Sequence, residues 1–216
     1  MINLQNVTAL VLHIHGKPYP IEGLEESIKY VNFKEVLLLT DDLEFKHEII
    51  KLRKICRINT SEEYSMFFIR ELWRCFDTEF CLTIHPDGFV INPESWTDKF
   101  LNYDYIGAPW KFYGGRFRDS LNQPGIGNGG FSLRSKKICK YVSDTYFLIN
   151  DNEDKYYSNV IECAKPANLK YPSVNLALQF SQETLLNKDI TPFGFHNFKT
   201  PGCDAGIYWY NKWKIK

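Results

Sequence analysis

The stretch Phe80–Gly88, FCLTIHPDG, decides the fold. Its first five residues form a short apolar run of the kind that makes a buried strand. This strand delivers the chain directly into the polar segment His85–Gly88, so His85 and Asp87 are expected at its carboxyl end. Because ligands of open α/β sheets bind at the carboxyl ends of the strands, the stretch predicts a ligand site that contains His85 and Asp87.

Upstream of this strand, apolar runs alternate with helical patterns. Val7–His15 and Glu35–Thr40 are short, rich in β-branched residues and end at polar or glycine residues, which predicts two more buried strands. Glu22–Val31 is predicted to be a helix, and Ser61–Phe76 a second one, with Ser61 as its N-cap and an acidic first turn. Strands that alternate with helices predict an α/β fold with a central, mixed but mainly parallel sheet flanked by helices.

Downstream of Gly88 the pattern changes. The expected elements are a strand, a loop rich in glycine and arginine, a second strand and two helices, at Tyr105–Pro109, Lys111–Gly127, Gly130–Arg134, Ser135–Leu148 and Asp154–Ala164. Beyond Lys165 the pattern is irregular, and prolines divide it. Since no repeat and no linker is visible, residues 1–216 are expected to form one domain whose halves share one sheet.

Composition excludes several classes of protein. Lysine plus arginine equal aspartate plus glutamate at 26 each, so no net positive field exists to hold a nucleic acid or an anionic membrane. The six cysteines show no metal-binding spacing and are expected to be reduced thiols, mostly in the core. The apolar run Val7–Ile14 is too short to cross a bilayer and no cleavable leader precedes it, so we expect a cytoplasmic protein without a membrane span.

Two separate segments supply candidate ligands for a metal ion. Asp87 precedes Gly88, a pair that also suits a simple turn. His196 lies within the aromatic segment Phe193–Phe198, where a lone histidine is more often a hydrogen-bonded core residue. Carboxylate and imidazole ligands nevertheless suit manganese, and an open octahedral site leaves room for two phosphate oxygens. Such an ion would offset the charge that grows on a diphosphate leaving group.

The glycine run Gly125–Gly130, GIGNGG, matches the GxGxxG pattern of dinucleotide-binding folds. That pattern requires a preceding strand and a helix that opens within it, whereas here a loop precedes the run and a predicted strand follows. The glycines are therefore expected to let the backbone lie close to a sugar or diphosphate, with Asn128 and Arg134 as hydrogen-bond donors. The alternative is a structural turn that Arg134 braces.

Glu153 and Asp154 open a predicted helix, where the helix dipole favours carboxylates, so capping alone is one interpretation of this pair. An inverting sugar transfer requires a carboxylate that takes the proton from the acceptor hydroxyl. Asp154 is the predicted base and Glu153 the second candidate. Aromatic residues make up 16% of the chain, and aromatic faces stack on sugar rings. Trp110 is predicted to bind a sugar in this way, with core packing as an equally good alternative.

Five segments stand in a recognisable order along the chain. They are HPDG (85–88), NYDYIGAPW (102–110), GNGGFSLRS (127–135), NEDKYYS (152–158) and PFGFH (192–196). This order resembles the DUF5672 family of proposed glycosyltransferases and, more distantly, the GT-A enzymes of the fringe type, over about residues 80–200. The resemblance implies a GT-A fold, with residues 1–90 as a nucleotide-binding half and 91–216 as an acceptor-binding and catalytic half.

The resemblance also implies roles for single residues. These are metal and nucleotide-sugar binding for Asp87, nucleotide-sugar binding for Gly88, proximity to the donor sugar for Gly129 and Gly130, proton abstraction for Asp154 and metal binding for His196. The sequence departs from the usual DxD pattern, because His85 stands where the first aspartate would be. Histidine is itself a metal ligand, so His85 joins the predicted metal site.

The strand ends near the N-terminus occupy the places where GT-A enzymes hold the nucleotide. The resemblance therefore assigns base and ribose binding to His15, Thr40 and Asp41, with uridine as the expected base. The leading hypothesis is an inverting, manganese- or magnesium-dependent transferase that moves sugar from a UDP-sugar to a glycan or other hydroxyl acceptor. A non-catalytic glycan-binding module and a metal-dependent phosphoesterase built on Asp87 and His196 are the alternatives, and a retaining mechanism stays open.

Overall fold

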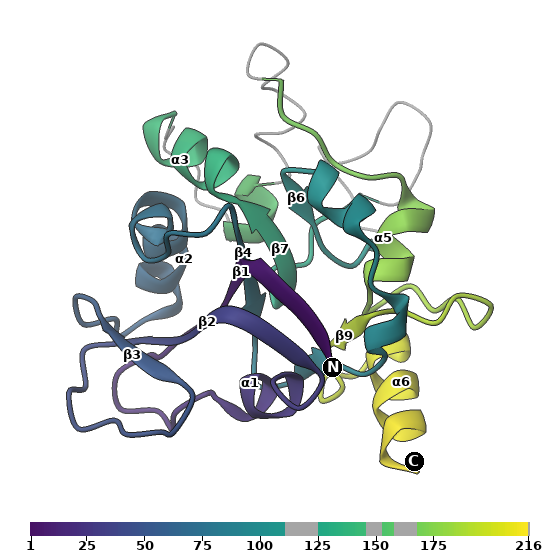
Figure 1. Cartoon of the computed structure of the whole chain (residues 1–216), viewed down its shortest axis with the longest axis horizontal. Coiled ribbons are helices and arrows are strands. Elements are labelled where there is room, and N and C mark those ends of the chain that lie inside the picture. The colour runs from purple at the N-terminus through teal and green to yellow at the C-terminus, as the bar shows by residue number, and fades with distance from the viewer. Residues whose placement is uncertain (111–124, 146–152, 158–167, 216) are drawn as a thin grey trace.

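The centre of the fold is a six-stranded sheet (Figure 1). The computed structural model of the chain describes residues 1–110, 125–145, 153–157 and 168–215. The strands, in their order across the sheet, are β3 (Lys51–Lys54), β2 (Val31–Thr40), β1 (Ile2–Leu12), β4 (Phe80–Ile84), β7 (Phe131–Ser135) and β6 (Tyr105–Ile106). β1, β2, β3 and β4 run parallel, whereas β7 is antiparallel to both of its neighbours. The predicted mixed, mainly parallel sheet is confirmed.

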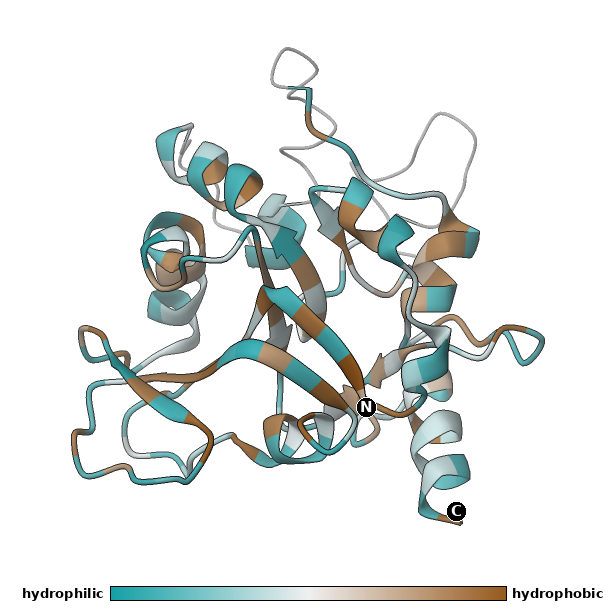
Figure 2. Ribbon diagram, viewed as in Figure 1, coloured by the Kyte–Doolittle hydropathy of each residue, from teal (hydrophilic) through white to brown (hydrophobic). Residues whose placement is uncertain are grey.

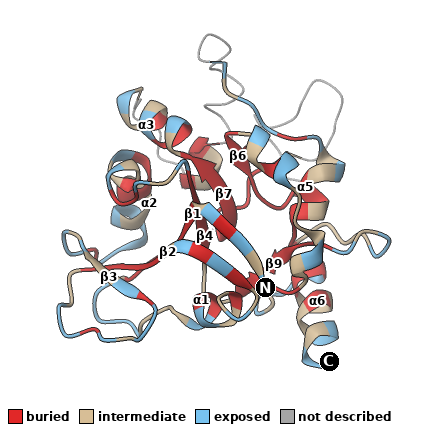
Figure 3. Ribbon diagram, viewed as in Figure 1, coloured by how far each residue is buried: buried red, intermediate tan, exposed pale blue. Residues whose placement is uncertain are grey.

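Helices cover both faces of this sheet. They are α1 (Glu22–Ser27), α2 (Ser61–Arg70), α3 (Lys136–Asp144) and α5 (Val174–Phe180), whereas α6 (Asp204–Lys214) packs elsewhere. Short 3₁₀ turns lie at Leu72–Arg74, Pro93–Ser95 and Asp98–Asn102. Side chains of β1 alternate between the faces, so that Val11 packs in the core under α1 and α5 while Leu12 packs in the core under α2 and α3. Figure 2 shows hydrophobic segments along the central strands, and Figure 3 shows that the same strands are largely buried.

A second, three-stranded sheet joins segments that are far apart in the sequence. β5 (Gly88–Val90) pairs antiparallel with β9 (Gly194–His196), and β9 pairs parallel with β8 (Ser181–Gln182). A separate aromatic core that includes Phe195 and Trp209 holds α6 against this sheet. The register places Gly88 opposite His196, and this pairing brings β9 to the turn that follows β4.

The predicted strand Phe80–Ile84 is confirmed to the residue as β4. The helix predicted at Glu22–Val31 was too long, because α1 ends at Ser27 and β2 already begins at Val31. Residues 31–35 alternate between buried and more exposed positions, so a search for continuous apolar runs missed this part of the strand. The predicted N-cap Ser61 was also wrong by one residue: the hydroxyl of Thr60 accepts the hydrogen bond from the Glu63 backbone N–H.

Other expected boundaries shift by one to six residues: β1 begins at Ile2 instead of Val7, α2 ends at Arg70 instead of Phe76, and β6 ends at Ile106 instead of Pro109. The strand expected at Gly130–Arg134 is β7, and its last residue, Ser135, caps α3 by accepting a hydrogen bond from the Ile138 N–H at 3.0 Å. Most of the loop expected at Lys111–Gly127, and the ends of the helices expected at Ser135–Leu148 and Asp154–Ala164, lie outside the described residues. None of the described helices has the length and apolar character needed to cross a bilayer.

Candidate functional site

The site begins at the turn after β4, where three predicted metal ligands meet. Pairing of β5 with β9 sets His196 beside this turn, and the Asn197 N–H donates to the backbone oxygen of Asp87 at 2.8 Å. His196 Nε2 lies 3.2 Å from Asp87 Oδ1. One ligand atom each of His85, Asp87 and His196 lies within 4.8 Å of the others. Residues separated by more than 100 positions in the sequence therefore form one compact cluster, here named the His–Asp–His cluster.

Each group of this cluster has a displaced pKa. Burial favours neutral His196, but the carboxylates of Asp87 and Glu183 outweigh burial and raise the pKa of His196 to about 9. Burial would raise the pKa of Asp87, yet the contact with His196 and the ring of His85 lower it to about 2. Burial, followed by the charge of His196, lowers the pKa of His85 to about 3. At neutral pH and without a cation, the cluster thus contains an ionised Asp87, a protonated His196 and a neutral His85.

The cluster fits a divalent cation on two grounds. Among the described residues, His196 Nε2 is a buried nitrogen that makes no regular hydrogen bond, and its nearest partner is the Asp87 carboxylate at 3.2 Å. A bound cation would coordinate this nitrogen. His85 Nε2 lies 2.6 Å from the hydroxyl of Tyr64, a hydrogen bond that fixes the orientation of the His85 ring. Two imidazoles and one carboxylate form a recurrent ligand set for first-row transition metals.

The predicted glycine pair makes room for the side chains of the site. A Cβ on Gly130 would lie 2.0 Å from His196 Nε2, and a Cβ on Gly129 would lie 2.4 Å from Glu153 Oε1. The carbonyl of Gly130 also accepts the His85 N–H at 2.7 Å. Only glycine lets the start of β7 lie this close to both functional groups.

The acidic pair sits on a helical turn at 153–157, supported from below by Arg134. Burial, followed by the charge of Glu153, raises the pKa of Asp154 to about 7. Glu153 Oε1 lies 3.4 Å from Arg134 Nη2. Arg134 is completely buried, and its guanidinium lies 4.5 Å from the ring centre of Tyr157. Arg134 was predicted to contact the donor, but the structure places it under the acidic pair, where it braces Glu153.

One cavity of about 660 Å³ connects the two clusters. The predicted site residues that line it are His85, Trp110, Asn128, Gly130, Glu153, Asp154 and His196. Asp87, Gly88, Gly129 and Arg134 are not among the residues that line it. A cation ligand and the predicted base therefore face the same space, as a reaction between a bound donor and an acceptor requires.

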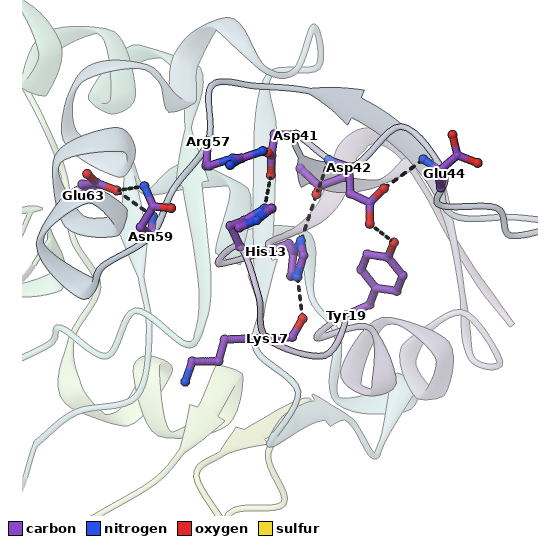
Figure 4. Close-up of polar contacts among 11 residues, drawn as sticks. His13, Lys17, Tyr19, Asp41, Asp42, Glu44, Arg57, Asn59 and Glu63 are labelled. Atoms are coloured by element: carbon purple, nitrogen blue, oxygen red, sulfur yellow. Dashed lines mark hydrogen bonds and ion pairs between the residues drawn. The ribbon is translucent and has the colours of Figure 1, made fainter.

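The predicted nucleotide-binding residues form a separate polar network at the carboxyl ends of β1 and β2, drawn in Figure 4. Asp41 contacts His15 at 3.3 Å and accepts a hydrogen bond from Arg57 Nε at 2.8 Å. The Arg57 hydrogen bond lowers the pKa of Asp41. Thr40 is buried, and its hydroxyl lies 2.9 Å from His13 Nδ1. None of His15, Thr40 and Asp41 lines the cavity, but Ile14, the neighbour of His15, does.

Sequence analysis missed two residues of the site. Tyr64 lies on the same face of α2 as the buried Phe68, and this i, i+4 spacing was the available signal. Glu183 follows the two-residue strand β8, is 5% exposed and contacts both Asn128 and His196. Its segment, SQETLL, carries no local sign of burial, because only the pairing of β8 with β9 places it in the site.

The fold, a mixed sheet with a cavity at the carboxyl end of β4, is similar to that of GT-A glycosyltransferases of known structure. A glycosyltransferase of Streptococcus pneumoniae TIGR4, GlyE in its apo form, superposes with a TM-score of 0.51 at 12% identity, covering 96% of this chain and 61% of its own. A glycosyltransferase involved in glycosylation of the major capsid of PBCV-1 superposes with a TM-score of 0.51 at 14% identity, covering 95% of this chain and 98% of its own. The chain thus spans about three fifths of the pneumococcal glycosyltransferase.

The chain belongs to the DUF5672 family, whose description is a protein of unknown function and whose pattern matches residues 46–196. This confirms the resemblance to DUF5672, whereas the more distant likeness to enzymes of the fringe type stays a prediction. No curated protein matches the chain. The identities to the solved glycosyltransferases are low, so these structures support the fold and do not identify the donor, the acceptor or the mechanism.

Proposed function

We propose that the chain is a glycosyltransferase that moves a sugar from a nucleotide diphosphate donor, a UDP-sugar, to a hydroxyl of a glycan or similar acceptor. One observation carries this proposal: a single cavity on a GT-A sheet is lined both by members of the His–Asp–His cluster and by the acidic pair Glu153 and Asp154. The first group suits a metal-bound diphosphate, and the second suits a proton acceptor.

His85, Asp87 and His196 are the residues that would hold the cation. When bound, a divalent cation offsets the negative charge that develops on the leaving diphosphate. Magnesium prefers oxygen ligands in octahedral geometry, whereas imidazole suits transition metals and manganese accepts both kinds of ligand. Because two of the three ligands are imidazoles, we propose manganese in preference to magnesium.

Asp154 is the proposed base. It takes the proton of the acceptor hydroxyl while that oxygen forms its bond to the anomeric carbon of the donor sugar. The bond from the anomeric carbon to the diphosphate oxygen breaks, and the diphosphate leaves with the electron pair. A base whose pKa is about 7 is ionised in a large share of molecules at neutral pH and still takes up a proton readily. Attack opposite to the leaving group makes the proposed transfer inverting.

The remaining residues are proposed to position the donor and acceptor. His15 and Asp41 would hold the uridine and ribose, within the nucleotide-binding half 1–90. Thr40, predicted to join them, is completely buried against His13, so it would only support this region. Asn128 would donate a hydrogen bond to the donor, near the close backbone approach at Gly129 and Gly130. Trp110, which lines the cavity, would stack on a sugar ring in the acceptor-binding half 91–216.

The proposal is tested by incubating the chain with a panel of UDP-sugars and Mn²⁺ and measuring UDP release with and without glycan acceptors. Release is expected with one sugar, and it should require Mn²⁺. Asp154→Asn should retain Mn²⁺-dependent UDP binding but lose transfer, whereas Asp87→Ala should lose both. Glycan binding that does not depend on nucleotide or metal, without sugar transfer, would contradict the proposal and favour a non-catalytic glycan-binding module.

A further inference from the structure

Glu183 lies in the floor of the cavity, behind the His–Asp–His cluster, and both oxygens of its carboxylate accept hydrogen bonds. Oε2 accepts from Asn128 Nδ2 at 2.8 Å. Oε1 lies 3.0 Å from His196 Nδ1 and accepts from Asn197 Nδ2 at 3.4 Å. The side chain is 7% exposed, so these contacts are made away from bulk water.

These contacts determine which nitrogen of His196 carries a proton. An ionised carboxylate can only accept, so the hydrogen between Oε1 and His196 Nδ1 must come from Nδ1. Asn128 Nδ2 also lies 3.0 Å from Nδ1. Nδ1 of His196 and Nδ2 of Asn128 then both donate to the carboxylate of Glu183, and they lie close to each other because they share this acceptor group. The alternative, an unprotonated Nδ1 facing Oε1 at 3.0 Å, would oppose two lone pairs in a buried site.

Because Nδ1 keeps its proton toward Glu183, Nε2 is the ring nitrogen that can give up its proton when a cation binds and then act as a ligand. Nε2 is the buried nitrogen that has no hydrogen-bond partner among the described residues, and it faces Asp87 Oδ1 at 3.2 Å. We propose that Glu183 is a positioning residue for the cation, which holds His196 with the Nε2 lone pair directed into the His–Asp–His cluster. This rests on the proposed function, because it takes that cluster as the cation site. Carboxylates in this outer position fix the ring and increase the basicity of the ligating nitrogen.

A purely structural role for Glu183 involves different atoms. The backbone oxygen of Glu183 accepts hydrogen bonds from the N–H groups of Ala205 at 2.9 Å and Gly206 at 3.0 Å, at the start of α6. Any side chain at position 183 can keep those two bonds. Glu183→Gln therefore retains the anchor of α6 and the size of the side chain, removes the charge, and replaces one acceptor oxygen by an amide group that donates.

The test is a titration of the full chain with Mn²⁺, followed by the electron paramagnetic resonance signal of free Mn²⁺. Glu183→Gln is expected to raise the Kd for Mn²⁺ by about 10- to 100-fold. Glu94→Gln makes the same chemical change at an exposed residue that does not line this cavity, and should bind like the unchanged chain. Thermal unfolding without metal checks that each variant is folded. If Glu183→Gln does not fold, Glu183→Asp withdraws the carboxylate by one methylene and should weaken binding too.

The outcomes separate this inference from the proposed function. A Kd for Glu183→Gln equal to that of the unchanged chain would overturn the positioning role and leave the cation site in place. Absence of Mn²⁺ binding by the unchanged chain would overturn both, as would unchanged binding by His196→Ala. A lower melting temperature with an unchanged Kd would assign Glu183 a structural role only.

Discussion

Replacement of Asp154 by asparagine is expected to stabilise the fold above neutral pH. The carboxyl group is largely buried next to Glu153, and both features oppose its ionisation, so its pKa is raised from 3.8 to about 7. In the unfolded chain the same group ionises freely near pH 4. Folding therefore becomes less favourable as the pH rises, because the unfolded state loses this proton first.

The size of the effect follows from the two pKa values. Each pKa unit corresponds to about 1.4 kcal/mol, so ionised Asp154 destabilises the fold by up to about 4 kcal/mol above pH 7. The loss begins as the pH passes 3.8 and is complete once it passes about 7. Asparagine has nearly the same shape and carries no charge, so Asp154→Asn should gain this free energy at pH 8 and almost none at pH 4.

Urea unfolding of both proteins at several pH values measures this difference directly. Asp77→Asn, at a side chain that is 93% exposed, is the matched control and should change stability by less than about 0.5 kcal/mol at any pH. A difference between Asp154→Asn and the unchanged chain that is the same at pH 4.5 and pH 8 would refute the raised pKa. A group retained at such a loss of stability is expected to serve function.

Three further changes test other parts of the site. Glu153→Gln removes a charge that raises the pKa of Asp154, so the midpoint of the pH–rate profile should move below 7. An unchanged midpoint would show that the charge of Glu153 does not influence the ionisation of Asp154. Gly130→Ala places a Cβ 2.0 Å from His196 Nε2 and should reduce Mn²⁺ affinity by more than about tenfold in calorimetry, whereas normal affinity would show that His196 is not a ligand. Arg134→Met leaves the buried carboxylate of Glu153 without its cationic partner and should lower the free energy of unfolding by about 3–5 kcal/mol, a loss that equilibrium urea unfolding would reveal or exclude.

Local features of the sequence were sufficient to predict the central strand and the site at its end. Phe80–Ile84 is a continuous apolar run, and the polar residues His85–Gly88 that follow it directly can be identified without knowing which distant segment contacts them. The acidic pair and the glycines of Gly127–Gly130 were found for the same reason, because each is a short contiguous pattern. His196 was identified from its residue type and the family resemblance, whereas its contact with Asp87 depends on the pairing of β5 with β9.

What could not be predicted depends on contacts between distant segments. Glu183 is drawn into the site by β8, a strand of only two residues. The helix Asp204–Lys214 has many aromatic residues, which are mediocre helix formers, and Pro201 just before it suggested irregular structure. Packing of Trp209 against Phe195 supplies the stabilisation that local propensity lacks.

The central claim is that the chain binds a nucleotide diphosphate through a cation held by the His–Asp–His cluster. A thermal-shift titration with UDP, GDP, CDP and ADP, each with and without Mn²⁺, tests it most directly, because a ligand of the native state raises the melting temperature. We predict a rise with UDP that requires Mn²⁺ and is lost in Asp87→Ala. No rise with any diphosphate, or a rise that persists in Asp87→Ala, would contradict the claim.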